Sequence, residues 1–161
     1  MLEKEEAIKK RLEEKFGFMA DKCAVIRERR LTAEAPREKL LEVLAFLKDG
    51  LGFGSLCTIT GLDSGENFEL INHLANGGIV LNLMVFAPKT DPVFDTVTGL
   101  YEGATMYELE ARNLLGLVIM GIPDDIKYPL PDDWPAGQYP LRKDWKKETP
   151  AEAQEGSVNN E

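Results

Sequence analysis

Three segments of the chain carry apolar residues at every third or fourth position, the spacing that places them on one side of a helix. Each segment ends at a glycine or just before one, and glycine favours the left-handed backbone found beyond a helix end. The three predicted helices cover residues 2–16, 36–50 and 105–116. Pro36 strengthens the second prediction, because proline suits the first turn of a helix.

The third predicted helix has two further signals near its start. Thr105 and Glu108 stand three residues apart, as in a capping box, where each side chain bonds to the backbone amide of the other. Glu108 and Arg112 stand four residues apart and predict an ion pair on the helix surface. Glu108 and Glu110 are two residues apart, so they diverge on a helix and cannot act as a catalytic pair of carboxylates.

Five other segments predict strands. They cover residues 23–32, 55–60, 68–74, 79–87 and 93–100. The turn Asn76-Gly77-Gly78 favours positive φ angles and predicts a hairpin between the third and fourth segments. The fourth segment is mostly apolar on both faces, which is typical of a central strand covered on both sides. The first segment carries charged residues at 27–30, so we expect an edge strand or a partly exposed one.

The chain changes character after Gly116. Six of the nine prolines and both tryptophans lie in this last part. Because proline fixes φ and lacks a backbone donor, the segment predicts an extended arm rather than a helix or a central strand. Its many aromatic residues argue against disorder, and tryptophan and arginine are favoured anchors at protein interfaces. We expect the arm to dock on another chain, with docking on its own domain as the alternative.

Together these elements predict an α+β fold: a single mixed or mostly antiparallel sheet of four to five strands, packed helices and an extended Pro- and Trp-rich C-terminal arm. A chain of 161 residues suits one domain with a buried core. We expect the sheet domain over residues 1–116, the docking arm over 117–149 and a flexible polar tail over 150–161.

The charge of the chain disfavours two classes of partner. A formal net charge of -9 speaks against nucleic acid and anionic membrane surfaces, which select for a basic face. The longest apolar run, residues 77–87, is shorter than the ~20 residues of a membrane-spanning helix. The charged N-terminal stretch does not resemble a secretory signal. We therefore expect a cytoplasmic protein, with reduced, buried thiols at Cys23 and Cys57.

The residue types in the chain offer little for catalysis. One histidine and two cysteines cannot supply four thiolates for an iron–sulfur cluster, and no Cys-x-x-Cys spacing predicts zinc. His73 is expected to be a hydrogen-bonded structural residue. The glycines at 50–54 lie between a helix and a strand, the reverse of the order that binds phosphate. We therefore expect no catalytic, cofactor-binding or metal site in this chain.

Two motifs resemble a known family. Residues 107–117 (YELEARNLLGL) resemble the signature helix of the 30 kDa subunit of respiratory complex I (NADH-quinone oxidoreductase). Residues 131–134 (PDDW) and 140–145 (PLRKDW) resemble the second motif of that family, in the same order and with similar spacing. Leu109 and Asn113 depart from the family's usual arginine and aspartate. The spacer 135–139 looks more like the homologous subunit of membrane-bound, energy-converting nickel–iron hydrogenases.

The resemblance implies a function that agrees with the lack of cofactor and metal ligands in the chain. It implies a cofactor-free peripheral subunit of a membrane-associated redox complex, either an energy-converting hydrogenase or a complex I-like oxidoreductase. The partners would be the catalytic large subunit, which this chain scaffolds, and neighbouring iron–sulfur subunits. Those partners would hold any iron–sulfur clusters and any nickel–iron centre. The chain would reach the membrane, on its cytoplasmic face, only through partner subunits.

Candidate partner contacts come from the two motifs. Glu110 and Arg112 are implied by the resemblance, and the others are aromatic, apolar or charged anchors of the arm. The expected interface residues are Glu110, Arg112, Trp134, Leu141, Arg142, Asp144 and Trp145. The alternative is a stand-alone protein-binding or assembly module whose arm folds back on its own sheet. An enzyme that uses acidic residues alone is poorly supported.

Overall fold

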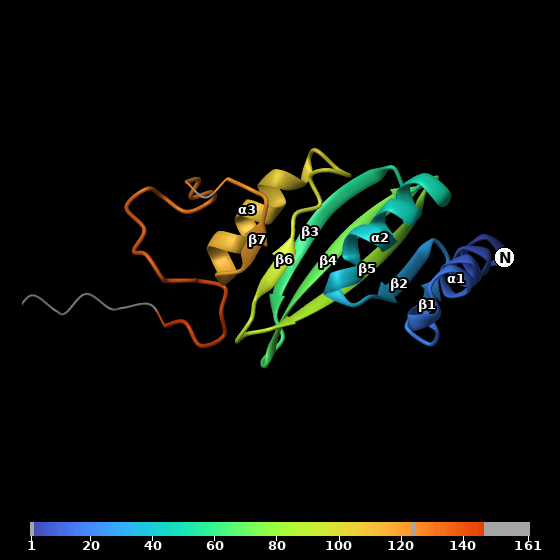
Figure 1. The fold of residues 1–161 in the computed structure, drawn as a ribbon, viewed down its shortest axis with the longest axis horizontal. Helices are drawn as coiled ribbons and strands as arrows, with labels where there is room; N and C mark the ends of the chain where they lie inside the picture. Colours follow the sequence, from blue (N-terminus) through green and yellow to red (C-terminus); the bar gives the residue numbers. More distant parts are fainter. Residues whose placement is uncertain (1, 124, 147–161) are drawn as a thin grey trace, which may run out of the picture.

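The computed structural model describes residues 2–123 and 125–146. Five strands form one sheet in the order β1-β2-β5-β4-β3 (Figure 1). Their bounds are β1 (Cys23–Arg27), β2 (Arg30–Glu34), β3 (Ser55–Asp63), β4 (Asn67–Asn76) and β5 (Ile79–Pro88). Neighbouring strands are antiparallel except β2 and β5, which are parallel. The predicted α+β fold with a mixed, mostly antiparallel sheet is therefore confirmed.

The hairpin between β4 and β5 is the best example of a fold element fixed by local chemistry. Asn76 pairs with Ile79, so the loop is only the two residues Gly77 and Gly78. Their φ angles are +54° and +84°. A two-residue loop with positive φ at both positions matches the twist of the strands that it joins. The predicted hairpin is thus confirmed, with strands slightly longer than expected.

Within the described residues, only one face of the sheet is fully covered. Along β5, Leu81, Leu83 and Val85 are fully buried, whereas the alternate residues Val80 and Met84 are half-buried. The expectation that both faces of this strand are covered was therefore wrong. The prediction failed because half-buried positions on the second face also tolerate apolar residues. These residues made the strand look as hydrophobic as one that is covered on both faces.

The helices pack on the buried face of the sheet. They are α1 (Glu3–Lys15), α2 (Leu40–Ala45) and α3 (Ala104–Leu115). In Figure 1, α1 lies at the end of the sheet near β1, α2 lies over its middle, and α3 lies at the opposite end beside β3. A 3-10 turn (Arg37–Lys39) precedes α2 and a π-helical turn (Phe46–Gly50) follows it. The predicted helix 36–50 is therefore three short helical segments in succession.

The predicted strand 23–32 is a hairpin. Arg29 has a φ of +62°, which ends β1 and turns the chain into β2. Glu5, buried on α1, stabilises this turn because its Oε1 accepts the Arg29 backbone N–H at 2.8 Å. The charged residues at 27–30 therefore form a turn rather than the middle of one strand. β1 lies at an edge of the sheet, as expected.

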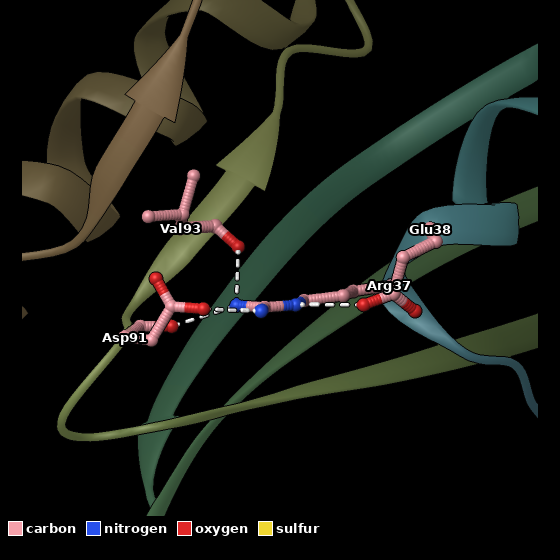
Figure 2. A network of polar contacts seen from close by, with 4 residues as sticks. All are labelled: Arg37, Glu38, Asp91 and Val93. Atoms are coloured by element: carbon pink, nitrogen blue, oxygen red, sulfur yellow. Dashed lines mark hydrogen bonds and ion pairs between the residues drawn. The ribbon is translucent and has the colours of Figure 1, made fainter.

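The predicted strand 93–100 leaves the main sheet. Only β6 (Val93–Asp95) is extended, and it pairs in parallel with β7 (Val118–Met120) in a separate two-stranded sheet. Arg37 positions the loop before β6 (Figure 2). Its Nη1 donates to the carbonyls of Asp91, at 2.7 Å, and Val93, at 3.2 Å, while its Nη2 pairs with the Asp91 carboxylate. A hollow of about 260 Å³ lies beside this arginine. The Arg37 guanidinium at this hollow is already paired with the Asp91 carboxylate.

Candidate partner-binding site

Helix α3 does not begin with the predicted capping box. It begins at Ala104, and its N-cap residue Gly103 makes no side-chain cap. The carboxylate of Glu108 is buried and points away from Thr105, to the turn after β6. It accepts the Val97 N–H at 2.7 Å and the Thr96 hydroxyl at 2.6 Å. Both the capping box and the Glu108–Arg112 surface pair were therefore wrong, because the Glu108 carboxylate is buried and bonded to the turn after β6.

Glu108 thus has a structural role that its motif position does not reveal. Burial raises the pKa of Glu108, while the hydrogen bonds from Thr96 and Val97 act in the opposite direction. The carboxylate connects α3 to the segment that carries β6 and so fixes how the helix lies against the small sheet. The spacing of residues within the helix could not show this role, because Val97 and Thr96, which donate to Glu108, lie 11 and 12 residues earlier.

Two residues of α3 bind the beginning of the arm. Arg112 donates to the carbonyls of Pro123 and, at 2.7 Å, Ile126. Asn113 donates through Nδ2 to the carbonyls of Ile126, at 3.0 Å, and Tyr128, at 2.7 Å. Arg112, predicted as a partner contact, therefore anchors the arm of its own chain. Asn113 adds to this anchor from the position where the family usually has an aspartate.

Arg142 of the second motif caps the C-terminus of α3. Its Nε donates to the Leu115 carbonyl at 2.6 Å and its Nη2 donates to the Gly116 carbonyl at 3.3 Å. The guanidinium also lies over two aromatic rings, 4.5 Å from the centroid of Tyr139 and 5.1 Å from that of Phe68. A cation is favourable at a helix C-terminus, where carbonyls lack helical partners. The N–H groups of Arg142, which were expected to bind a partner carboxylate, therefore bind carbonyls of this chain.

Gly116 makes this cap possible. Its φ of +72° is the left-handed conformation that ends α3. A Cβ at this position would lie 2.6 Å from Nη2 of Arg142 and 2.6 Å from the Tyr139 ring. Glycine is therefore required both for the backbone angle and for the close approach of the arm.

Asp63, the last residue of β3, binds the backbone of Lys143 in the arm. Its side chain is almost fully buried and accepts from Lys89 Nζ at 2.6 Å and from the backbone N–H groups of Lys143 and Gly65, both at 2.9 Å. Burial alone would raise the pKa of Asp63. The hydrogen bonds, from Lys89 first, outweigh burial and lower that pKa to about 2. Asp63 is therefore a charged buried link between the sheet and the arm.

The two tryptophans of the arm pack together. Their ring centroids lie 6.2 Å apart. Gln138 joins them, because its backbone carbonyl accepts from Trp134 Nε1 and its side-chain oxygen accepts from Trp145 Nε1, both at 2.9 Å. Both tryptophans are half-buried within the arm. They give the loop between the two motifs a fixed shape.

The structure gathers most of the predicted interface residues around the C-terminal half of α3 and the arm. Arg112 and Arg142 bond to this chain's own carbonyls, as described above. Glu110, Leu141 and Asp144 are exposed. Sequence reasoning missed Asp63 and Tyr139, whose roles arise from contacts with distant segments. The expected tail over 150–161 lies outside the described residues.

The two cysteines and the histidine have different surroundings. Cys23 is buried, and burial raises the pKa of its thiol to about 11. Cys57 is exposed, contrary to the prediction, because a bulge in β3 between Leu56 and Thr58 changes the register there. His73 is hydrogen-bonded, as predicted: Thr60 Oγ1 lies 2.9 Å from its Nε2 and Asn82 Oδ1 lies 2.9 Å from its Nδ1.

The described part of the chain contains neither a group of metal ligands nor a helix suited to cross a membrane. Over 2–123 and 125–146, no three or more side chains of histidine, cysteine, aspartate or glutamate are grouped so that they could hold a metal ion. Among the helices of these same residues, none has the length and apolar character needed to cross a membrane.

Comparison with known proteins gives the family. The family described as "Respiratory-chain NADH dehydrogenase, 30 Kd subunit" matches residues 33–151. A subunit of the F(420)H(2) dehydrogenase of Methanosarcina mazei is 34% identical over 121 residues, which are 73% of this chain and 76% of that protein. The beta subunit of the membrane-bound hydrogenase of Pyrococcus furiosus is 30% identical over 122 residues, which are 73% of this chain and 70% of that protein.

A solved structure agrees with these relatives. A chain of the membrane-bound sulfane sulfur reductase, an archaeal respiratory membrane complex, superposes with a TM-score of 0.79 at 28% identity. The match covers 89% of this chain and 86% of that one. The chain therefore belongs to the 30 kDa subunit family of the respiratory-chain NADH dehydrogenase. This membership supports the expected peripheral subunit of a membrane-associated redox complex and not the stand-alone module.

Proposed function

We propose that this chain is a cofactor-free peripheral subunit that scaffolds the catalytic large subunit of its complex and binds that partner through α3, β7 and the arm. One observation carries the proposal. Six of the eleven large apolar residues that are exposed in the described chain belong to these three elements, which lie together at one end of the molecule (Figure 1). The six residues are Met106, Val118, Met120, Ile126, Tyr128 and Leu141. Exposed apolar surface that gathers in one region is typical of a protein interface.

The intramolecular contacts of the arm support this proposal. Arg112 and Asp63 bind the backbone of the arm, and Arg142 of the arm binds α3, so the backbone that carries the exposed side chains is held before any partner binds. An ordered surface loses less conformational entropy on binding than a flexible one. A scaffolding role also agrees with the relatives, because the Pyrococcus furiosus protein is named as a subunit of a membrane-bound hydrogenase. On this proposal, neighbouring subunits hold the clusters, and partners bring the chain to the cytoplasmic face of the membrane.

Leu141→Asp should weaken assembly with the large subunit. Leu141 is 53% exposed, so the change should leave the fold intact while placing a charge in an apolar contact. We expect at least about tenfold weaker binding, since an apolar interface anchor is worth more than about 1 kcal/mol. The measurement is the yield of large subunit that co-purifies with the tagged chain when the two are co-expressed.

Ile26→Asp provides the control. Ile26 is 61% exposed on β1, at the end of the molecule remote from α3 (Figure 1). It should bind the large subunit as the parent chain does. Equal losses for the two variants, or no loss for Leu141→Asp, would contradict an interface at α3 and the arm.

The purified chain should contain no stoichiometric iron, nickel or zinc. The reason is the residue inventory: one histidine and two cysteines, of which Cys23 is buried and His73 is hydrogen-bonded on both nitrogens. Elemental analysis and a visible absorption spectrum check this. One metal ion per chain that survives dialysis against a chelator would refute the cofactor-free part of the proposal.

A further inference from the structure

A narrow cleft of about 220 Å³ runs between β3 and α3. One wall is the edge strand, from Thr58 to Gly61. The other wall is a stripe along α3, made of Tyr107, Glu110, Ala111 and Leu114. These positions are spaced by three, one and three residues, so they lie on one side of the helix. The cleft is therefore a groove between two regular elements rather than a gap in a loop.

Fixed contacts define the ends and the floor of the groove. At one end the Tyr107 hydroxyl donates to the Cys57 carbonyl at 3.2 Å. At the other end the Leu141 N–H donates to the Leu114 carbonyl at 3.0 Å, which places the exposed leucine beside the groove. At the floor, a Cβ on Gly61 would lie 2.7 Å from Cδ1 of Leu115. Glycine at 61 therefore allows the close approach of helix and strand, and the groove is preformed.

The lining of the groove has a simple chemistry. Ten residues line it, and Glu110 is the only one of them that carries a charge. Glu110 is exposed, and the structure shows no ion pair for it with any described residue. On the strand side the Thr60 hydroxyl is already bonded to His73, and the remaining lining is mostly apolar. An apolar groove with one unpaired carboxylate at its rim is complementary to a side chain with an apolar stem and a cationic end.

We propose that the groove receives a lysine or arginine side chain from the large subunit, which pairs with Glu110 and lays its stem against Ala111 and Leu114. The inference rests on the proposed function and adds the position and chemistry of the central contact. Charge complementarity favours this occupant, because no cation of the described chain lines the groove. Continuity favours it too, since Leu141 belongs both to the groove and to the exposed apolar surface.

Charge reversal at Glu110 gives the first test. In co-expression with the large subunit, Glu110→Lys should lower the affinity by about tenfold or more, because it replaces an attraction with a repulsion. Glu110→Gln should lower it by about threefold, with a difference from the parent that shrinks as salt rises. The matched control is Glu14→Lys, an exposed reversal on α1 at the remote end (Figure 1). It should bind as the parent does.

A steric change gives an independent test. Leu114→Trp enlarges a side chain that lines the groove, leaves Glu110 in place and should also lower the affinity by about tenfold. Thermal melting of each variant checks the fold, and Glu110→Lys remains informative if Leu114→Trp does not fold. If the parent chain binds the large subunit and both Glu110→Lys and Leu114→Trp bind equally well, the groove proposal is overturned while the proposed function stands. If the parent itself does not bind, both fail.

A photo-crosslinker locates the occupant. Benzoylphenylalanine in place of Leu114, in the assembled complex, should crosslink to a peptide of the large subunit that contains lysine or arginine near the attachment point. Crosslinks only within this chain, only to another subunit, or to a large-subunit segment without a basic residue would each overturn the inference.

Discussion

Arg142→Ala should lower the free energy of unfolding of the isolated chain by about 3 kcal/mol. The side chain makes two hydrogen bonds to carbonyls at the end of α3 and lies over two aromatic rings. Its removal leaves the Leu115 and Gly116 carbonyls without these donors and removes one of the contacts that hold the arm on the helix. Urea unfolding followed by circular dichroism measures the effect.

Two further variants show whether the geometry or only the charge matters. Arg142→Lys keeps the cation but loses the planar fork, so it should recover less than half of the lost stability. Lys143→Ala is the neighbouring control: its backbone amide binds Asp63, but its side chain is exposed. We expect a change within about 0.5 kcal/mol for it. An Arg142→Ala variant as stable as the parent would mean that the arm does not cap α3.

Asp63→Asn should have a comparable effect, about 3 kcal/mol at neutral pH. The carboxylate accepts three hydrogen bonds, one of them from the cation of Lys89. An amide at this buried position cannot pair with that cation and would direct an N–H at existing donors. The control is Glu66→Gln, an exposed change in the β3–β4 turn, which should leave stability nearly unchanged.

The same variant tests the pH dependence of folding. The pKa of Asp63 is lowered in the folded chain to about 2, from an ordinary value of 3.8. A lowered pKa means that the unfolded chain binds the proton more tightly, so the contribution of Asp63 is complete above 3.8 and is lost as the pH falls toward 2. The stability difference between the parent and Asp63→Asn should therefore shrink over this range. A difference that stays constant would show that Asp63 does not titrate as a buried, bonded carboxylate.

Local chemistry in the sequence predicted the parts of the fold that depend on neighbouring residues. The Gly77-Gly78 turn needs positive φ at both positions, and it forms. Gly116 was expected to end the third helix, and it does so in the left-handed conformation. The order of the helices and of most strands was recovered for the same reason, because periodicity and stop signals act over a few residues. The predicted strand 23–32 is two strands, however, and β7 lies in the segment predicted as an arm.

Predictions failed where the deciding contact is distant in sequence. Glu108 matched the capping-box spacing, but its partners lie in the turn after β6. Arg142 was expected to bind a partner carboxylate, yet its acceptors are carbonyls 26 and 27 residues earlier. The charged residues around Arg29 were predicted to belong to an exposed strand, but they form a turn. The acceptor that stabilises this turn is Glu5 on α1, 24 residues away. No local pattern carries such information.

These contacts also change how the second motif is understood. Its arginine and the following backbone amide hold the arm on α3 and β3, whereas the leucine between proline and arginine is exposed. The motif thus divides into residues that position the arm and a residue that is available to a partner. The division explains how a segment without regular secondary structure can present a fixed surface.

A structure of the assembled complex tests the central claim most directly. A single-particle reconstruction should show this chain against the catalytic large subunit, with Leu141 and the β3–α3 groove buried in the contact, a basic side chain beside Glu110, and no cofactor density within this chain. A reconstruction that leaves α3 and the arm exposed to solvent, while the chain contacts its neighbours only through α1 and β1, would contradict the account.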